Sequence, residues 1–325
     1  MGLTDSFGRT INYLRLSVTD RCNMRCVYCM PAGGIPLISH REVLSYEEFL
    51  LIARAAVAAG IEKIRVTGGE PLVRKGIIRF LSQLSAIPGL RQLVLTTNGL
   101  LLDEMAESLR EAGVQRLNVS LDSLGAGTFA TITRGADVSR VLTGIEAAER
   151  AGFPIKINVV VMAGINDAEV LDFAALTLDR PWAVRFIEYM PAIRSDNWEA
   201  LVVPGESILD RIGARFTLLP LERDNMAGPA RLFRIAGSSG SIGVITAVSG
   251  HFCGECNRIR VTATGRVRSC LFSDAGLDLK PLLATGDEAG LAAALRTIVA
   301  AKPGRHFLAT TEQQHTPFAM SAIGG

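Results

Sequence analysis

The sequence lacks long hydrophobic runs, has no marked excess of either charge, and contains few aromatic residues. Its best apolar stretch, residues 159–165, is far shorter than the roughly 18 residues that a membrane helix needs. Lys and Arg number 34 against 32 Asp and Glu, a net charge of +2, which argues against a nucleic-acid binder. With 48% hydrophobic and 20% charged residues, the 325-residue chain has the composition of a globular protein with a large aliphatic core.

Charged residues interrupt the first twenty positions, at Asp5, Arg9, Arg15 and Asp20. We therefore expect no secretory signal peptide and no membrane association, and a cytoplasmic location follows. The chain has only six cysteines, and in a reducing compartment these are better candidates for metal or redox chemistry than for disulfides.

A βα rhythm occupies the first 190 residues. Short apolar runs lie at 13–18, 64–67, 92–96, 116–121, 155–162 and 183–187, and helical patterns lie near 45–59, 76–87, 103–112, 137–151 and 167–178. Ser45 and Glu48 form a capping box at the start of the first helix. Such alternation predicts parallel strands joined by right-handed crossovers, in either a doubly wound sheet or a partial barrel.

The distribution of polar and apolar side chains on the two faces of each strand decides between these folds. Arg15, Arg65, Lys156 and Arg185 each lie between apolar neighbours, so one face of these strands is cationic. A central strand of a doubly wound sheet is apolar on both faces. We therefore predict an α/β fold, an incomplete TIM-type barrel of about six parallel strands with a polar lumen.

The rhythm changes after Pro191. A helix is predicted at 207–212, strands at 231–235 and 243–248, and a hairpin of 259–262 with 267–271 around Gly265. We assign residues 1–235 to the barrel core and 236–325 to a C-terminal α+β extension packed on the open side of the barrel. No internal linker separates the two parts.

The cysteines form two triplets, Cys22/Cys26/Cys29 (the first triplet) and Cys253/Cys256/Cys270 (the second triplet). Three thiolates on a short loop can hold three irons of a [4Fe–4S] cluster and leave the fourth iron open to another ligand. Spacing alone favours a cluster over zinc for the first triplet. For the second triplet, with His251 nearby, structural zinc is as good an explanation as a cluster.

Two motifs resemble those of the radical S-adenosylmethionine (radical SAM) enzymes. Residues 22–29, CNMRCVYC, follow the first predicted strand and place an aromatic residue just before the third cysteine. Residues 67–71, TGGEP, resemble the motif with which that superfamily contacts the amino group of the methionine moiety. Glycines there let the backbone approach a ligand closely.

Further motifs extend the resemblance along almost the whole chain, to the GTP 3′,8-cyclase family of molybdenum cofactor biosynthesis. They are DRCN at 20–23, RVTGGEP at 65–71, LTTNG at 95–99, NVSLD at 118–122, KIN at 156–158, RFIEYM at 185–190 and CNRIR at 256–260. A double-glycine tail completes the pattern. In that family the second triplet also holds a [4Fe–4S] cluster, which favours iron over zinc there.

The resemblance implies a role for each matching residue. The two [4Fe–4S] clusters would be held by Cys22, Cys26 and Cys29 and by Cys253, Cys256 and Cys270. Contacts to S-adenosylmethionine fall on Tyr28, Gly69, Ser120 and Met190. Contacts to GTP fall on Arg15, Arg65, Thr96, Lys156, Arg258, Ile259 and Arg260. Arg185 would assist reduction or proton delivery, unless it forms a structural ion pair with Glu188, and Gly324 and Gly325 would reach into the active site.

The implied reaction converts GTP to (8S)-3′,8-cyclo-7,8-dihydroguanosine 5′-triphosphate, the first step of molybdopterin formation. A 5′-deoxyadenosyl radical takes the ribose 3′ hydrogen, and C3′ then bonds to C8 of the base. The implied partners are an electron donor such as flavodoxin or ferredoxin and the downstream cyclic pyranopterin monophosphate synthase. A homodimer is also compatible with the resemblance.

Other interpretations remain open. Internal carboxylates at Glu70, Asp122 and Glu188 are alternative partners for the lumenal cations, although several desolvated cations together favour a polyanion. A radical SAM enzyme acting on another substrate, such as a peptide, would keep the same core. A non-catalytic iron–sulfur or zinc scaffold is the third hypothesis.

Overall fold

The structure is a computed structural model that describes residues 2–31, 33–190, 198–222, 226, 228–250, 252–273, 275–306 and 320–323. Its strands are β1 Tyr13–Ser17, β2 Lys63–Thr67, β3 Gln92–Thr97, β4 Arg116–Ser120, β5 Ile155–Val161, β6 Ala183–Glu188, β7 Leu218–Leu221, β8 Arg231–Ile235, β9 Ser241–Ile245, β10 Arg258–Val261, β11 Arg266–Arg268 and β12 Gly276–Asp278. All of them join one sheet, in the order β12-β11-β10-β1-β2-β3-β4-β5-β6-β9-β8-β7.

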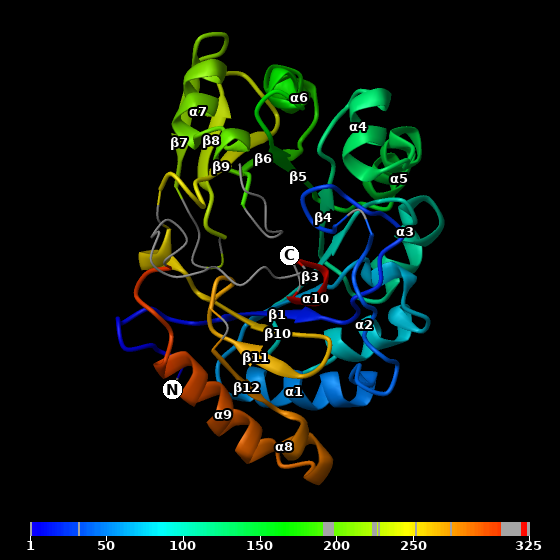
Figure 1. Cartoon of the computed structure of the whole chain (residues 1–325), viewed down its shortest axis with the longest axis vertical. Coiled ribbons are helices and arrows are strands. Elements are labelled where there is room, and N and C mark those ends of the chain that lie inside the picture. Colours follow the sequence, from blue (N-terminus) through cyan, green and yellow to red (C-terminus); the bar gives the residue numbers. More distant parts are fainter. Residues whose placement is uncertain are drawn as a thin grey trace.

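The helices are α1 Tyr46–Ala58, α2 Ile77–Ser85, α3 Leu102–Glu111, α4 Ala126–Thr133, α5 Val138–Arg150, α6 Val170–Asp179, α7 Gly205–Gly213, α8 Lys280–Thr285, α9 Glu288–Ala300 and α10 Met320–Ile323. Short 3-10 turns lie at Pro71–Val73, Asp167–Glu169, Trp198–Leu201 and Cys253–Glu255. Figure 1 shows α1 to α6 on the outside of a curved sheet, with α10 near its centre.

Strands β1 to β6 run parallel in sequence order, which confirms the predicted partial barrel. Local signals position the helices that connect these strands. Ser45 and Glu48 form the expected capping box at α1, and Gly60, Gly113 and Gly152 have the positive φ that follows a helix end. Each helix therefore stops where the chain must turn back toward the sheet.

The C-terminal extension was predicted to pack on the open side of the barrel, and in the structure its strands continue the barrel sheet at both edges. It adds β10 parallel to β1 at one edge of the barrel sheet and β9 parallel to β6 at the other. Strands β8 and β9 are antiparallel neighbours, so the boundary proposed between residues 235 and 236 falls inside one hairpin. The predicted hairpin around Gly265 is confirmed as β10 and β11.

The hydrophobic core lies between the outer face of the sheet and the helices. Leu14, Val66, Leu117 and Ile157 project from alternate strand positions into it and are fully buried. Their sequence neighbours therefore face the lumen. No helix in the described ranges combines the length and the hydrophobicity that a membrane span requires.

Candidate active site

The first triplet lies in the loop after β1, and all three of its cysteines line one cavity inside the barrel. The C-terminal end of α4 holds this loop, because Arg25 N and Val27 N donate to Thr133 O and Ile132 O at 3.3 and 2.8 Å. Arg134 adds hydrogen bonds to the carbonyls of Arg25 and Met30 at 2.7 and 2.8 Å. The cysteine loop is thus fixed on both sides of Cys26 and Cys29.

The glycine motif after β2 packs directly on the beginning of this loop. Gly69 N donates to Thr19 O at 2.7 Å, and Glu70 N donates to Arg21 O at 2.8 Å. A Cβ at Gly69 would overlap the carbonyl oxygen of Arg21 and lie 2.7 Å from its carbonyl carbon. The backbone at Gly69 therefore closely approaches the segment of residues 19–21, and not only a ligand as the sequence had suggested. Gly69 also lines the cavity.

Glu70 connects the same motif to the end of β3. Its buried carboxylate accepts from Leu72 N, Thr97 Oγ1 and Asn98 N at 3.0, 2.9 and 2.7 Å. Burial raises the pKa of Glu70 to about 7, although these hydrogen bonds oppose the shift. Asn98 in turn contacts Cys22 Sγ at 3.8 Å, so Glu70 positions a neighbour of the first triplet.

Tyr28 makes a second connection between the cysteine loop and the sheet. Its hydroxyl donates to Asp122 Oδ2 at 2.7 Å, and Asp122 Oδ1 accepts from Val160 N at 2.8 Å. Burial raises the pKa of Asp122 to about 6, and the two hydrogen bonds oppose the shift. The aromatic residue before the third cysteine is therefore fixed against the ends of β4 and β5.

The second triplet gathers at the opposite end of the neighbouring strand. Cys256 precedes β10, which runs parallel to β1 with Tyr13 opposite Arg258, whereas Cys22 follows β1. Cys270 follows β11, which is antiparallel to β10 and returns the chain to the same end. Five-residue β1 spans roughly 13 Å at about 3.3 Å per residue. The cavity that both triplets line is therefore long enough to hold a ligand between them.

Cations surround Cys256. Burial raises the pKa of its thiol, but the charges of Arg258 and Lys302 and hydrogen bonds from Arg258 outweigh this and lower the pKa to about 6. Burial raises the pKa values of Cys22, Cys26 and Cys253. A thiol with a lowered pKa is a better metal ligand near neutral pH.

The donor sets suit iron–sulfur clusters. All six cysteines are free of disulfides and face one cavity. Among the described residues, no three His, Cys, Asp or Glu side chains converge on a point suited to one metal ion. A four-iron cluster makes a different demand, because each thiolate binds its own iron. His251, the nearby candidate zinc ligand, lies outside the described residues.

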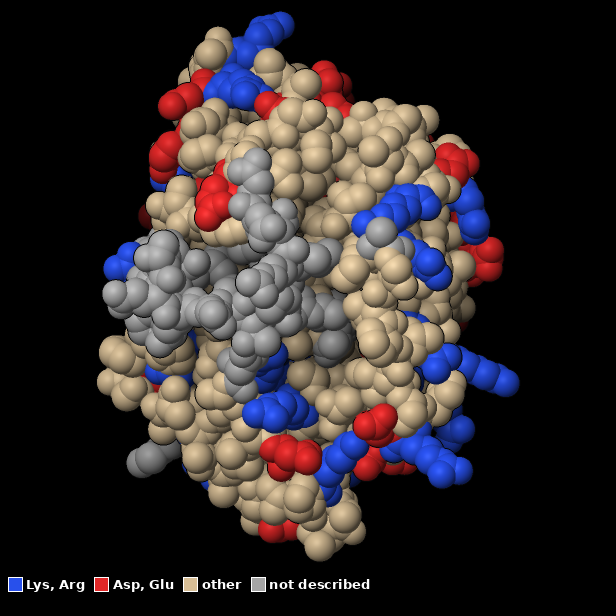
Figure 2. Space-filling model, in the orientation of Figure 1, with Lys and Arg blue, Asp and Glu red and all other residues tan. Residues whose placement is uncertain are grey.

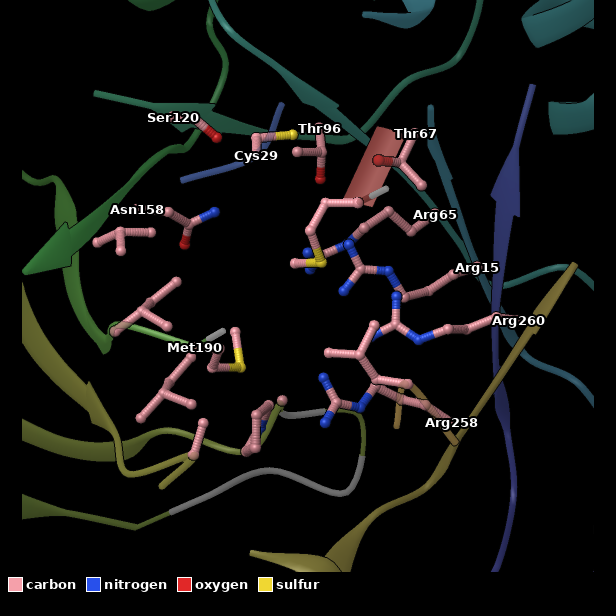
Figure 3. A pocket seen from close by; sticks show the side chains of 18 of the residues that line it. Arg15, Cys29, Arg65, Thr67, Thr96, Ser120, Asn158, Met190, Arg258 and Arg260 are labelled. Atoms are coloured by element: carbon pink, nitrogen blue, oxygen red, sulfur yellow. The ribbon is translucent and has the colours of Figure 1, made fainter. Parts of the chain in front are cut away.

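Between the triplets, three guanidinium groups lie side by side. Arg15 pairs in register with Arg260 on β10 and with Arg65 on β2, so all three point into the lumen from adjacent strands (Figure 3). We call Arg260, Arg15 and Arg65 the cationic row. Neighbouring strands lie about 4.8 Å apart, so the like charges repel one another. Burial is the main cause that lowers the pKa of Arg15, and the charges of Arg260 and Arg65 lower it further. Burial and the charge of Arg258 lower the pKa of Arg260 to about 9.

Three of the lumenal cations have no carboxylate partner among the described residues. Neither Arg65, Lys156 nor Arg185 forms an ion pair with a carboxylate in the described part of the chain. Glu188, the alternative partner of Arg185, accepts instead from Gly205 N and Val248 N at 2.6 and 2.7 Å. The alternative of internal carboxylate partners is therefore wrong for Arg185.

Polar atoms remain available to a ligand in this cavity. Arg65 Nε, Arg185 Nε and Thr96 Oγ1 are buried and have no hydrogen-bond partner within the described residues. The terminal nitrogens of Arg65 donate to Asn118 Oδ1 at 2.8 and 2.7 Å in the amide orientation that satisfies both groups. A buried donor without a partner is costly, so a ligand that accepts these hydrogen bonds would bind favourably.

Most of the predicted site residues meet in this one cavity. The lining includes Tyr28, Gly69, Ser120 and Met190, and also Arg15, Arg65, Thr96, Arg185, Arg258 and Arg260 (Figure 3). Lys156 shares a strand face with the lining residue Asn158 but does not itself line the cavity. Ile259 lies in the hydrophobic core, on the face opposite Arg258 and Arg260. Gly324 and Gly325 lie outside the described residues. They directly follow α10, whose first residue, Met320, lines the cavity.

Sequence reasoning assigned no role to several residues that shape the site. Asn98 lies inside a quoted motif, and its place in that motif was the available signal; Asp122 was considered only as a partner of the lumenal cations, whereas it accepts from Tyr28. Arg134, Arg9 and Lys302 had no such signal, because each reaches the cysteines through contacts between segments far apart in the chain.

Comparison with known proteins agrees with this geometry. The radical SAM superfamily model matches residues 16–177, and the model for Molybdenum Cofactor Synthesis C matches residues 182–308. A GTP 3′,8-cyclase of Geobacter sulfurreducens is 65% identical over 326 residues, covering 100% of both chains. The chain belongs to the GTP 3′,8-cyclase family. Another member, from Moorella thermoacetica, is 47% identical and covers 99% of this chain and 100% of its own.

Membership of this family confirms the radical SAM interpretation and implies an enzyme that uses S-adenosylmethionine and a [4Fe–4S] cluster. A solved structure, SuiB of Streptococcus suis, has the same type of fold, with a TM-score of 0.58 at 13% identity. The match covers 90% of this chain and 69% of SuiB. On the face shown in Figure 2, Lys and Arg side chains are interspersed with Asp and Glu side chains.

Proposed function

We propose that this protein converts GTP to (8S)-3′,8-cyclo-7,8-dihydroguanosine 5′-triphosphate in the first step of molybdenum cofactor biosynthesis. The observation that carries the proposal is the cationic row between two cysteine triplets in a single cavity. Its full-length relatives named GTP 3′,8-cyclase support the same reaction. A triphosphate provides the dense negative charge that buried guanidinium groups require.

The first triplet would hold the cluster that binds S-adenosylmethionine. When bound, the cluster and S-adenosylmethionine supply a 5′-deoxyadenosyl radical that removes the ribose 3′ hydrogen of GTP. Tyr28, Gly69, Ser120 and Met190 lie at or just beyond the carboxyl ends of different strands, so they can enclose a cofactor at that end of the barrel. Their task is to orient the cofactor and to exclude water.

The cationic row would hold the triphosphate of GTP, together with Thr96 and Arg258. Lys156 and the backbone of Ile259 remain proposed contacts at the edges of this site. Fixing the phosphates brings ribose and base into one orientation, which C3′ to C8 bond formation needs. Arg185 is proposed to assist reduction or proton delivery, since its buried Nε has no partner in the described residues and burial lowers its pKa to about 9. Gly324 and Gly325 are proposed to act near the lining residue Met320.

The second triplet is proposed to hold a second [4Fe–4S] cluster that faces the base of GTP. A flavodoxin or ferredoxin is proposed as the electron donor, the product is proposed to pass to cyclic pyranopterin monophosphate synthase, and the chain is proposed to work as a homodimer. We also propose a cytoplasmic location, because thiols that ligate clusters are kept reduced there.

Replacing Arg65 tests the assignment of GTP to the cationic row. Arg65→Gln keeps a polar side chain but removes the charge, and a charge-assisted hydrogen bond is worth about 1.5–3 kcal/mol. We therefore expect kcat/KM for GTP to fall roughly 10- to 150-fold at about 1.4 kcal/mol per tenfold. Cleavage of S-adenosylmethionine measured without GTP should be unchanged.

Arg234→Gln is the matched control, because Arg234 is exposed on β8 and does not line the cavity. It should retain the kcat/KM of the parent. If Arg65→Gln lost basal cleavage and GTP conversion to the same extent, the proposed phosphate contact would be refuted.

A further inference from the structure

Lys302 is a buried cation that neither the motifs nor the proposed GTP contacts include. It follows α9, lines the cavity beside the second triplet, and its residue is 3% exposed. Moving an ammonium group out of water is costly unless hydrogen bonds and negative charge compensate for it. The hydrogen-bond partners of its ammonium group therefore indicate what the residue does.

The ammonium group of Lys302 contacts the two chain segments that carry Cys256 and Cys270. It donates to Arg258 O at 3.0 Å and to Ser269 O at 2.5 Å, and it also forms a hydrogen bond with the Cys256 side chain. Arg258 lies two residues after Cys256, and Ser269 directly precedes Cys270. An ammonium group has three donors, and here one reaches the Cys256 side chain while the other two reach backbone carbonyls in the segments that carry Cys256 and Cys270.

A second buried cation completes the arrangement from the other end of the chain. Arg9 donates to Cys253 O at 2.5 Å and to Pro303 O at 2.8 Å, and its Nε pairs with Asp5 at 2.5 Å. Arg9 therefore joins Cys253 to the residue that follows Lys302. Each cysteine segment of the second triplet is thus held by a cation from outside it.

The charge of Lys302 acts directly on the thiolates. Cys256 and Cys270 both interact electrostatically with its ammonium group, and Arg258 adds a second positive charge at the Cys256 sulfur. Hydrogen bonds to cluster sulfurs and nearby positive charge favour the reduced, more negative form of an iron–sulfur cluster. Both effects would therefore shift the reduction potential of a cluster at this triplet in the same direction.

We propose that Lys302 is a positioning residue of the second triplet, which aligns Cys256 with Cys270 and raises the reduction potential of the cluster they hold. The proposal rests on the proposed second [4Fe–4S] cluster. Arg9 supports it by fixing Cys253 and the chain next to Lys302.

The test uses the full chain with Cys22, Cys26 and Cys29 replaced by Ala, so that only the second triplet can bind a cluster. Lys302→Met removes the charge and the donors at similar side-chain length, and Lys302→Arg keeps the charge. Lys75→Met is the matched control, since Lys75 is exposed before α2. After anaerobic reconstitution, iron and sulfide per chain and the midpoint potential are measured for each variant.

We expect Lys302→Met to shift the reduction equilibrium at least tenfold toward the oxidised form, which is about 59 mV more negative for one electron. Lys302→Arg should lie between Lys302→Met and the parent, and Lys75→Met should match the parent. A Lys302→Met protein with the parent's iron content and potential would overturn the proposal. Circular dichroism of each variant separates lost cluster binding from failure to fold. If Lys302→Met does not fold, Lys302→Gln takes its place, because it removes the charge but keeps a hydrogen-bond donor. A parental potential in cluster-loaded Lys302→Gln would overturn the potential claim.

The same series separates this proposal from the proposed second cluster. If the parent lacking the first triplet binds zinc and no sulfide, both the cluster and the role of Lys302 in its potential are refuted. If the parent binds a cluster and Lys302→Met behaves identically, only the role of Lys302 is refuted.

Discussion

The first triplet and the second triplet are chemically alike, but the residues around them differ. Asn98 and Glu70 stand behind Cys22, whereas Arg258 and Lys302 contact Cys256. The first set fixes position through the amide of Asn98 and the buried carboxylate of Glu70, and the second places positive charge next to the sulfur. We therefore expect the two triplets to have separable functions.

Single cysteine replacements test that separation. Cys22→Ala should abolish cleavage of S-adenosylmethionine, because an open iron requires three intact thiolate ligands at the first triplet. Cys270→Ala should leave cleavage measurable but abolish cyclisation of GTP. Cleavage and product are both measured by chromatography of the same anaerobic reactions, and retained cleavage in Cys22→Ala would exclude that loop from the mechanism.

Gly69 provides a residue-scale test of how closely two segments pack. An added Cβ would collide with backbone atoms of Asp20 and Arg21, which cannot move aside as a flexible side chain can. Gly69→Ala should cost about 1–3 kcal/mol of stability through overpacking and should reduce iron incorporation.

Gly127→Ala is its control. Gly127 lies in α4 with open space where its Cβ would be, so alanine there should be neutral or stabilising by about 0.5–1 kcal/mol. Chemical unfolding of the cluster-free proteins measures both changes. Equal stability of the two variants would show that the glycine motif does not need this close contact.

Sequence patterns predicted the chemistry of these residues better than they predicted which atoms the residues contact. Arg15 and Arg65 were assigned to the lumen by alternation, and both line the cavity. Ile259 was included with Arg258 and Arg260, yet the same alternation places it in the core. Lys302 was missed because its contacts with Arg258 and Ser269 bridge 44 and 33 residues of sequence.

At the scale of elements, Asn166 joins two strand ends through one buried side chain. Its Nδ2 donates to Asp122 O and Val160 O at 2.6 and 2.8 Å, and its Oδ1 accepts from Met162 N at 2.8 Å. These contacts connect the loop after β4 to β5, next to the partner of Tyr28. The carboxyl ends of the two strands are therefore held in register by one amide.

Replacing Asn166 by alanine should destabilise the cluster-free protein by about 2–4 kcal/mol, because three buried or partly buried backbone groups lose their partner. Gln83→Ala, on the exposed side of α2, should change stability by less than about 0.5 kcal/mol. The midpoint of urea unfolding followed by circular dichroism measures both. A fall in Asn166→Ala no larger than that of Gln83→Ala would contradict this role.

Helices and strands with a clear hydrophobic periodicity or a capping motif were predictable from the sequence, and those with neither were not. Helix α1 has the Ser45–Glu48 capping box, and it was predicted within one or two residues at each end. Helix α9 begins at Glu288 after the N-cap Asp287 and was missed, because its many alanines weaken the contrast between the buried Leu291 and Leu295 and the polar face. Strand β12 is three residues long and is defined by pairing with β11 rather than by its own sequence.

At the scale of the molecule, the sheet brings both ends of the chain to one site. Strand β10 from the C-terminal part pairs with β1 from the N-terminal part, which sets Arg260 beside Arg15. This pairing was not predictable from local patterns, since the two strands are more than 200 residues apart in sequence. It creates the cationic row and places the second triplet at the opposite end of β1 from the first.

The most direct test of the proposed function is the formation of 5′-deoxyadenosine by the anaerobically reconstituted, reduced protein, with GTP or with ATP in its place. A cavity that holds the triphosphate and base of GTP between two triplets predicts that GTP stimulates 5′-deoxyadenosine formation and that ATP does not. Formation that is independent of GTP would contradict the substrate assignment while leaving the radical chemistry intact. No 5′-deoxyadenosine from demonstrably cluster-loaded protein under any condition would contradict the proposed function as a whole.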